Sequence, residues 1–336
     1  MEIKFKDFIY IRPDIETIKK STELLLNDFN NAENGEIQFE ILKKINDLRS
    51  DFDTMSRIAS IRYTINTHDE FYSSEHDYFD DIGPVYSGLI NKIYRALTES
   101  PYRETLEMKC GKQLFDVAEI VLKTFSDEVI DDLKKENQLT TKYVRLVASA
   151  KINFEGEERN LAGLSLYMES ENRDVRKSAY DAKWSFFEKH ENEIDTIYDE
   201  LVKVRTVIAK KLGYENFVSL GYDRLRRTGY TQKEVAGFRD EVKEFIVPMT
   251  HTLKEIQKQR TGLDHLYYFD SEYNFKNGNP TPKGSPEWIV EKAKIMYEEL
   301  SQETGEFMNF MIDHEVMDLY NRKGKSAGGY CTYIRN

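Results

Sequence analysis

The chain has 336 residues, with 48 Lys and Arg against 60 Asp and Glu, which gives a formal net charge of −12. Its 17 glycines and 7 prolines are fewer than an average protein carries, so long uninterrupted elements are expected. Together with 32% charged residues, this composition predicts a mainly α-helical protein. An aromatic content of 12% excludes a disordered acidic chain. The acidic balance argues against nucleic acid as a partner, because phosphate binding needs concentrated Lys and Arg.

Two further features concern the compartment in which the protein works. No stretch approaches the roughly 18 consecutive apolar residues that cross a bilayer, and the N-terminus lacks the pattern of a secretory signal. The two cysteines, Cys110 and Cys331, are far apart, so they predict neither a disulfide framework nor a Cys-rich metal cage. The sequence therefore predicts a cytoplasmic protein with no membrane partner.

The first part of the chain has the apolar spacing of successive amphipathic helices. Pro13 is suited to open the first helix, and Asn34-Gly35 separates it from the second. In the third helix, Gly83-Pro84 predicts a break, because proline has no N–H to donate and its ring clashes with the preceding turn. Helices are expected here over residues 14–30, from 39 towards 67, over 70–97 and over 117–133.

The periodicity changes near residue 150. Lys151–Phe154 alternates and Glu155–Glu157 is typical of a turn, so a short β-strand and a second extended piece are expected. Helix resumes with Asn172 or Asp174 as its cap. This helix has the most regular apolar stripe in the protein. It is expected to end at Lys210–Gly213, where lysines precede a glycine, as is common at helix C-termini.

The last part of the chain mixes helices with a long loop. A helix over residues 238–256 is expected to kink at Pro248. Clustered Gly and Pro residues predict a loop over Tyr268–Pro286. Two further helices and a final strand of β-forming residues are expected over 289–300, 307–319 and 329–334.

The histidines form no recognisable metal centre. None of the six occurs in H-E-x-x-H, the pattern in which two imidazoles share a helix face and the glutamate activates water. His314 and Asp318 would share a face, but a hydrogen-bonded or surface histidine explains this pair better. A metal site assembled from His68, His76 or His314 is kept as a minor alternative. Since no G-x-S-x-G elbow, P-loop or Cys–His pairing occurs either, no residue is assigned as catalytic or metal-binding.

Several long segments nevertheless resemble one known family. The run from Asn172 to Leu220 includes Asn-Arg-Asp-Val-Arg-Lys-Ser-Ala-Tyr and Lys-Lys-Leu-Gly-Tyr-Glu-Asn-Phe. It is similar to the oligoendopeptidase F family, bacterial relatives of thimet oligopeptidase. Further similar segments, in the same order along essentially the whole chain, lie at 10–14, 226–230, 298–301, 303–307, 313–315, 323–325 and 328–332.

The resemblance implies a cytoplasmic zinc metalloendopeptidase, a hydrolase that cleaves short peptides between two mainly helical lobes. It also implies that a zinc helix with H-E-x-x-H follows shortly after Gly-Gly-Tyr-Cys-Thr, and that a further glutamate ligand comes later. These 336 residues contain no such motif. Zinc is thus expected in the complete family enzyme, whereas this chain alone is expected to be truncated, to bind no zinc tightly and to be inactive, because a catalytic zinc needs about three protein ligands.

The candidate substrate-binding residues are Gly328, Gly329, Tyr330 and Thr332. Strand formers dominate the run Tyr330–Ile334, and an edge strand can pair with an extended peptide backbone. Glycines permit a close approach of that backbone, and the resemblance places the segment beside the metal helix. A strand that merely closes a sheet is the alternative interpretation.

The expected fold is mainly α, a two-lobed zincin-type peptidase part with a small β element. Residues 1–160 are predicted to form the N-terminal helical region, and residues 161–336 the first part of the catalytic domain. A non-catalytic helical protein that binds peptides or serves as a scaffold is the alternative function. Short peptides are the expected partners.

Overall fold

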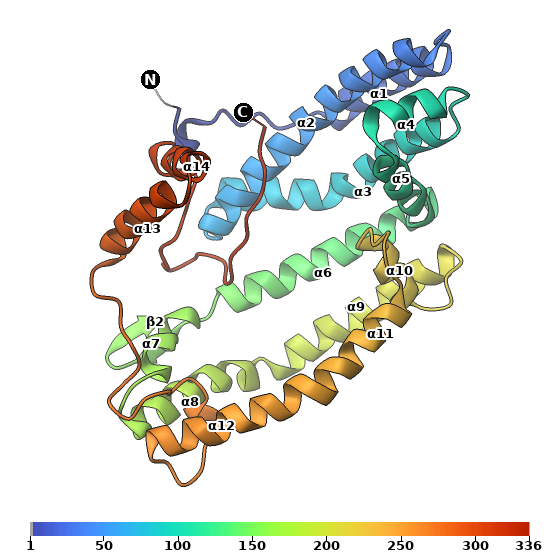
Figure 1. The fold of residues 1–336 in the computed structure, drawn as a ribbon. Helices are drawn as coiled ribbons and strands as arrows, with labels where there is room; N and C mark the ends of the chain where they lie inside the picture. The colour runs from blue at the N-terminus through green and yellow to red at the C-terminus, as the bar shows by residue number, and fades with distance from the viewer. Residues whose placement is uncertain (1–2, 336) are drawn as a thin grey trace. The chain divides into compact units, whose positions relative to one another are not determined.

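A computed structural model describes residues 3–335, which are mainly helical with one two-stranded sheet (Figure 1). The chain divides into two compact units, and each unit combines segments that are far apart in the sequence. The larger unit combines residues 11–148, 190–248 and 328–335, and the smaller unit combines residues 3–10, 149–189 and 249–327. The mainly α fold class with a small β element is confirmed. The division of the sequence at residue 160 stays a prediction.

A membrane-crossing helix would have to be both long and apolar, and none of the helices within residues 3–335 meets both conditions.

The first helices of the larger unit begin at side-chain caps. Asp14, Asn34 and Asp69 each accept a hydrogen bond from a backbone N–H of the first turn that follows, which satisfies donors that the helix itself leaves unpaired. The helices expected over 14–30 and from 39 towards 67 are confirmed. The unit contains α1 (Ile15–Asn30), α2 (Gly35–Ile65), α3 (Glu70–Thr98), α4 (Arg103–Cys110), α5 (Lys112–Lys123), α6 (Ile130–Ala148), α9 (Glu191–Lys211), α10 (Phe217–Arg224) and α11 (Gln232–Glu241).

Several apolar clusters hold these helices together. One joins α1 to α5 through buried side chains such as Phe29, Leu97 and Phe115. Another joins α6, α9 and α10 through Ile208 and Leu220. Burying such side chains contributes about 1.5–3 kcal/mol each, so α6 is fixed firmly against α9. It also packs against α3.

The break expected at Gly83-Pro84 is wrong, because α3 runs through Pro84 without interruption. Proline at this position leaves the carbonyl of Asp80, four residues earlier, without its helical donor. The side chain of Asn137 on α6 supplies the missing hydrogen bond, with its Nδ2 at 3.1 Å from that carbonyl oxygen. A residue more than fifty positions away therefore keeps this helix continuous.

Replacing Asn137 by alanine is expected to cost about 1–2 kcal/mol of unfolding free energy, because the Asp80 carbonyl then lacks a partner. In a Pro84→Ala background, the new N–H of residue 84 can bind that carbonyl, so Asn137→Ala should cost clearly less. Urea unfolding of the wild type, the two single variants and the double variant measures the difference. Equal costs in both backgrounds would contradict this account of the helix.

The apolar stripe over residues 117–133 is not one helix, which corrects the expectation. α5 ends at Lys123, a short turn and a 3₁₀ helix (Asp127–Val129) follow, and α6 begins at Ile130. The Thr124 hydroxyl donates to the carbonyl of Val121 at 2.9 Å, a local bond that competes with helix continuation. The apolar pattern persists through the turn because Val129 is itself fully buried.

The sheet of the smaller unit is formed by the short strand and the second extended piece expected near residue 150, which pair as a hairpin. Strands β1 (Ile152–Phe154) and β2 (Glu157–Arg159) pair antiparallel, with Phe154 opposite Glu157. Both residues of the intervening turn have positive φ, 51° at Glu155 and 79° at Gly156. This is the geometry of tight hairpin turns whose twist matches that of the strands.

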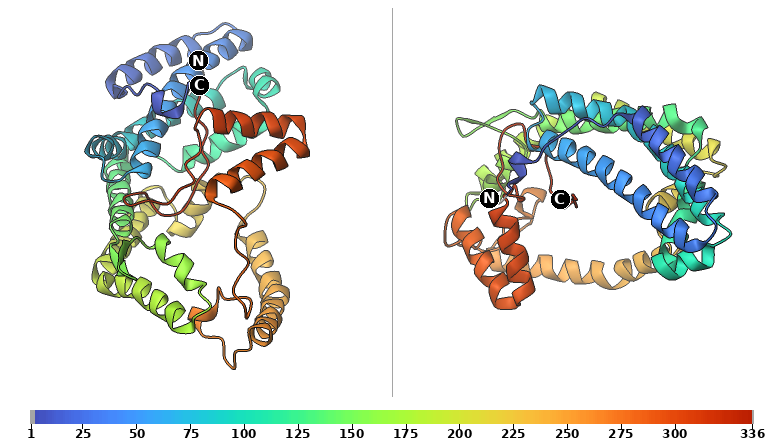
Figure 2. Two further views of the ribbon diagram at one scale, coloured as in Figure 1. Left: turned by 90° about the vertical axis from the view of Figure 1, so that its left-hand side faces the viewer. Right: turned by 90° about the horizontal axis from the view of Figure 1, so that it is seen from above.

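The remaining helices of this part are α7 (Ser165–Met168), α8 (Arg173–Lys189), α12 (Val247–Thr261), α13 (Pro286–Leu300) and α14 (Gln302–Asp313). The predicted loop before Pro286 is confirmed, apart from a short 3₁₀ turn (Tyr268–Asp270). Figure 2 shows α13 and α14 side by side as a hairpin.

Three helix boundaries differ from those expected or refine them. The regular stripe after residue 172 is interrupted at His190, between α8 and α9. α14 begins at Gln302 and ends at Asp313 rather than at 319. A π-helical segment, Val242–Ile246, lies between α11 and α12 just before Pro248, and the kink expected at Pro248 itself stays a prediction.

Candidate functional site

The strand expected over residues 329–334 is wrong. Residues 328–335 have no regular secondary structure and pair with no strand in the described part of the chain. A β-strand is defined by hydrogen bonds to a neighbouring strand, and these residues have none. The β-forming sequence therefore yields an extended segment instead of a sheet.

This C-terminal segment, residues 328–335, is attached to α2 by side chains. As residue numbers rise along the segment, the numbers of its partners on α2 fall, so the two run in opposite directions. The contacts join Tyr330 to Thr64 (2.6 Å between hydroxyl oxygens), Arg57 to the hydroxyl of Thr332, and Arg335 to Asp47 (2.8 Å).

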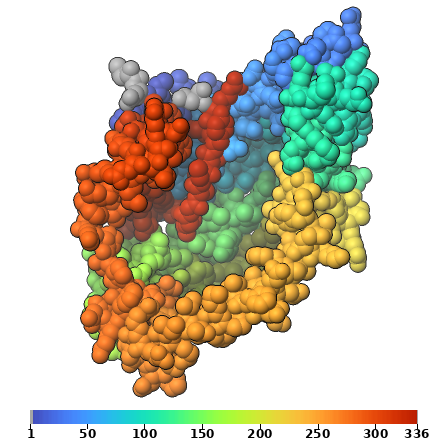
Figure 3. All heavy atoms as spheres, viewed as in Figure 1, coloured from blue at the N-terminus to red at the C-terminus, as the bar shows by residue number. Residues whose placement is uncertain are grey.

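The backbone of this segment is available to a partner. Among the described residues, the N–H groups of 329–334 donate no hydrogen bond, and Gly328, Gly329 and Tyr330 are exposed. Figure 3 shows the segment as a red column with no part of the chain in front of it. Gly328 has a φ of 87°, a conformation that favours glycine. The four predicted site residues thus lie together on one accessible segment.

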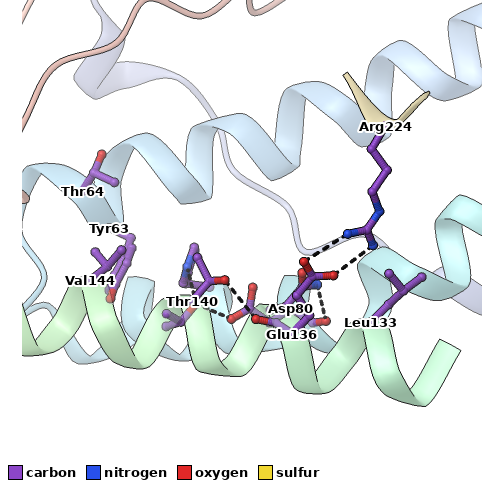
Figure 4. Close-up of a pocket in the computed structure, with 11 residues that line it drawn as sticks. Tyr63, Thr64, Asp80, Leu133, Glu136, Thr140, Val144 and Arg224 are labelled. Atoms are coloured by element: carbon purple, nitrogen blue, oxygen red, sulfur yellow. Dashed lines mark hydrogen bonds and ion pairs between the residues drawn. The ribbon is translucent and has the colours of Figure 1, made fainter. Parts of the chain in front are cut away.

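A pocket of about 460 Å³ lies in the same unit, between α2, α3 and α6, with Arg224 of α10 at one end (Figure 4). Tyr63 and Thr64 lie at the opposite end in this view. Thr64 also bonds Tyr330, so the pocket and the C-terminal segment share a residue. We call it the α6 pocket, because α6 supplies most of its lining.

A hydrogen-bonded group of side chains stands in the wall of the α6 pocket. The Thr141 hydroxyl donates to Asp80 Oδ2 at 2.6 Å, and its oxygen lies 3.3 Å from His76 Nε2. The His76 ring stacks on the Tyr63 ring, with 4.2 Å between their centroids. Burial raises the pKa of Asp80 and lowers the pKa of His76, since burial disfavours the charged form of either group.

Glu136 forms the charged end of the pocket. Its carboxylate accepts hydrogen bonds from Arg205 Nε at 2.7 Å and from both terminal nitrogens of Arg224 at 2.9 and 3.1 Å. Burial alone would raise the pKa of Glu136, but the bonds and charges of Arg224 and Arg205 lower it. This carboxylate is therefore ionised and fully engaged by the protein itself.

Sequence reasoning missed this pocket. The spacing of His76 and Asp80 by four residues on one helix was the available signal. Tyr63 and Thr141 come from other helices, and nothing in the local sequence relates them to His76. The group is assembled by the packing of α2 and α6 against α3.

The described residues do not fit a zinc ion. Within residues 3–335, no three His, Cys, Asp or Glu side chains gather closely enough to hold a metal. His314 Nδ1 lies 2.7 Å from the carbonyl oxygen of Ile3. Asp318 is held by Arg322 and Lys325, whose hydrogen bonds lower its pKa to about 2. His76 is engaged in the pocket wall, so the minor alternative has no support.

Similarity to known protein families decides the identity of the chain. Residues 5–125 match the peptidase M3 N-terminal domain, and residues 166–336 match peptidase family M3. The chain belongs to peptidase family M3. The resemblance found in the sequence is thereby confirmed, because oligoendopeptidase F proteins are among the similar structures.

Solved structures of M3 peptidases share this fold. PZ peptidase A, solved with an inhibitor, is 55% identical with a TM-score of 0.98, and the match covers 98% of this chain and 59% of that chain. A Bacillus anthracis strain Ames protein assigned as an oligoendopeptidase F is 50% identical with a TM-score of 0.97, over 99% of this chain and 61% of that one.

A curated relative is more distant. Oligopeptidase PepF of Bacillus subtilis (strain 168) is 24% identical over 184 residues, which cover 49% of this chain and 24% of PepF. The chain therefore spans about three-fifths of the matched M3 structures and a quarter of this relative.

Proposed function

We propose that this chain forms the peptide-contacting part of a zinc-dependent M3 oligopeptidase and hydrolyses no peptide by itself. One observation carries the proposal: the chain matches PZ peptidase A over 98% of its own length, yet its described residues contain no set of metal ligands. Short peptides are the proposed partners, and residues 1–160 and 161–336 the proposed domains. A cytoplasmic setting is supported by the two cysteines, which are both unpaired.

The chemistry of the family explains why a ligand set matters. A catalytic zinc lowers the pKa of a bound water and polarises the scissile carbonyl, and it needs about three protein ligands with one open position. The described residues offer no such set. None of them is therefore assigned a step in hydrolysis.

The C-terminal segment supports peptide contact. An extended peptide can add to an exposed edge when main-chain N–H and C=O groups are free to pair. Residues 329–334 donate no hydrogen bond within the described chain, and side chains hold the segment extended on α2. We infer that Gly328, Gly329, Tyr330 and Thr332 bind a peptide backbone.

Zinc content and peptidase activity, measured on one dialysed sample, test the first half of the proposal. We expect no zinc above the buffer blank and no chelator-sensitive cleavage of an internally quenched fluorogenic oligopeptide. One zinc per chain, together with turnover that a chelator abolishes, would overturn it.

Fluorescence anisotropy with a labelled short peptide tests the second half. Saturable binding is expected, and Thr332→Pro should weaken it about five- to tenfold more than Thr332→Ala, because only proline removes a backbone donor. The alanine variant is the control for the lost contact with Arg57. Equal affinities of the two variants, or no saturable binding, would contradict the assignment of these residues.

A further inference from the structure

The α6 pocket and the C-terminal segment both lie in the larger unit and meet at Thr64. Tyr330 bonds Thr64, and the neighbouring Tyr63 stacks on His76. His76 in turn contacts Thr141, which donates to Asp80. A continuous series of contacts therefore leads from the segment to the Asp80 carboxylate inside the pocket.

The pocket has a carboxylate without a cation of its own. Asp80 accepts one side-chain hydrogen bond, from Thr141, and no cation within the described residues forms an ion pair with it. The nearby guanidinium of Arg145 is paired with Asp77 at 2.7 Å. Asp80 is half-buried, and a carboxylate that is partly removed from water without an ion-pair partner is costly, so a cation from outside would be bound favourably here.

The other charged lining residues do not offer a competing site for an anion. Arg224 lines the pocket, but both its terminal nitrogens already donate to Glu136. Burial lowers the pKa of His76, so its ring is neutral near pH 7. Asp80 is thus the charged lining group with unused hydrogen-bonding capacity.

The pocket also has room and apolar walls for a long side chain. Leu133 and Val144 both line it. They lie eleven positions apart on α6, which is about 16 Å along a helix axis. Lysine and arginine place their aliphatic stems on apolar surface while their charged ends reach polar groups.

We propose that the α6 pocket is a subsite that accepts a cationic group of a bound peptide, the ammonium of lysine or the guanidinium of arginine, against the Asp80 carboxylate. This inference rests on the proposed function, because the peptide in question is the one that lies along residues 328–332. It assigns to the chain a preference for basic residues that the extended segment alone does not provide.

The experiment compares acetylated, amidated peptides that differ at one position, lysine or arginine against norleucine. Binding is measured by anisotropy competition with the wild-type chain, with Asp80→Asn and with the control Asp81→Asn. Asp81 is the adjacent exposed carboxylate, bonded to Gln138. We expect the basic peptides to bind about tenfold or more tightly than the norleucine peptide, Asp80→Asn to abolish the preference, and Asp81→Asn to keep it.

The preference should also depend on pH. Asp80 and His76 face Tyr63 from α2, Asp77 from α3, and Thr141 and Arg145 from α6. As the pH falls through the raised pKa of Asp80, the carboxylate becomes neutral, and protonation of His76 adds a repelling charge. The preference for lysine should therefore decrease in acid, whereas the affinity of the norleucine peptide should change little.

Each outcome decides between the two proposals. If all peptides bind equally, or if Asp81→Asn removes the preference as fully as Asp80→Asn does, the subsite is wrong and the proposed function stands. If no peptide binds, both fail. If a norleucine peptide with a free N-terminus binds as tightly as the acetylated lysine peptide, the pocket recognises an ammonium group and the source of that group is the peptide terminus.

The imidazole NMR signals of His76, assigned with His76→Gln, give a second test. These signals must shift when the lysine peptide binds, and unshifted signals would also overturn the subsite.

Discussion

Replacing Asp270 by alanine is expected to destabilise the protein by about 3–5 kcal/mol, because it leaves a buried arginine without its counter-charge. Asp270 and Arg176 are 0% and 1% exposed, and Arg176 donates to Asp270 Oδ1 at 2.7 Å. Arg173 donates to the other oxygen at 2.7 Å. The pair therefore fixes α8 to the loop that begins after α12, and α8 has few other fully buried residues.

Urea unfolding of wild type, Asp270→Ala and the control Asp264→Ala measures this effect. Asp264 is an exposed carboxylate of the same loop, so its removal should change the unfolding free energy by no more than about 0.5 kcal/mol. Similar midpoints for Asp270→Ala and Asp264→Ala would show that the buried ion pair does not stabilise the loop.

The pH dependence of this contribution has a definite sign. Burial alone would raise the pKa of Asp270, but the hydrogen bonds of Arg173 and Arg176 lower it. A carboxylate whose folded pKa is depressed stabilises the protein above its unfolded pKa of about 3.9, and this contribution is lost as the pH falls through the folded value. The difference between wild type and Asp270→Asn should therefore shrink in acid and stay constant near neutral pH.

Replacing Glu136 by alanine is expected to cost about 3 kcal/mol, the second-largest effect. Its carboxylate joins α6 to Arg205 of α9 and Arg224 of α10. Without it, two guanidinium groups that now share one carboxylate lose their common counter-charge. A second substitution, Arg224→Leu, should recover part of the loss in the Glu136→Ala background, because it removes the unpaired charge.

A control and a double-mutant cycle test this arrangement. Glu128→Ala removes an exposed carboxylate that lies just before α6, and little change in the urea midpoint is expected. If Arg224→Leu destabilises the wild type and the Glu136→Ala variant equally, the two residues are not coupled and the argument is wrong.

The fold class was readable from the sequence because it depends on interactions between near neighbours. The low number of Gly and Pro residues and the recurrence of apolar residues every three or four positions predicted the helices. Asp14 and Asn34 cap α1 and α2 through hydrogen bonds to nearby backbone N–H groups. The turn at Glu155–Glu157 between two extended pieces was also a local signal, and in the structure these pieces pair as a hairpin. Motif order along the chain indicated the M3 family.

The errors arose where a distant residue controls the local backbone. Pro84 does not break α3, because Asn137 supplies the missing donor. The apolar pattern of residues 117–133 continues across a turn, because Val129 in that turn packs against side chains of α9 and α10. Tyr330–Ile334 has strand-forming side chains but no neighbouring strand in the described chain, so it attaches to α2 by hydroxyl and ion-pair contacts.

By itself, the sequence determined a mainly helical protein and its peptidase family, whereas the contact of residues 328–332 with a peptide backbone stays a prediction. The tertiary structure alone decided the continuity of α3, the extended form of residues 328–335 and the α6 pocket with Asp80 in its wall. The reason is the range of the forces involved. Helix propensity and capping act over a few residues, whereas hydrogen-bond partners and pocket walls come from helices far apart in the chain.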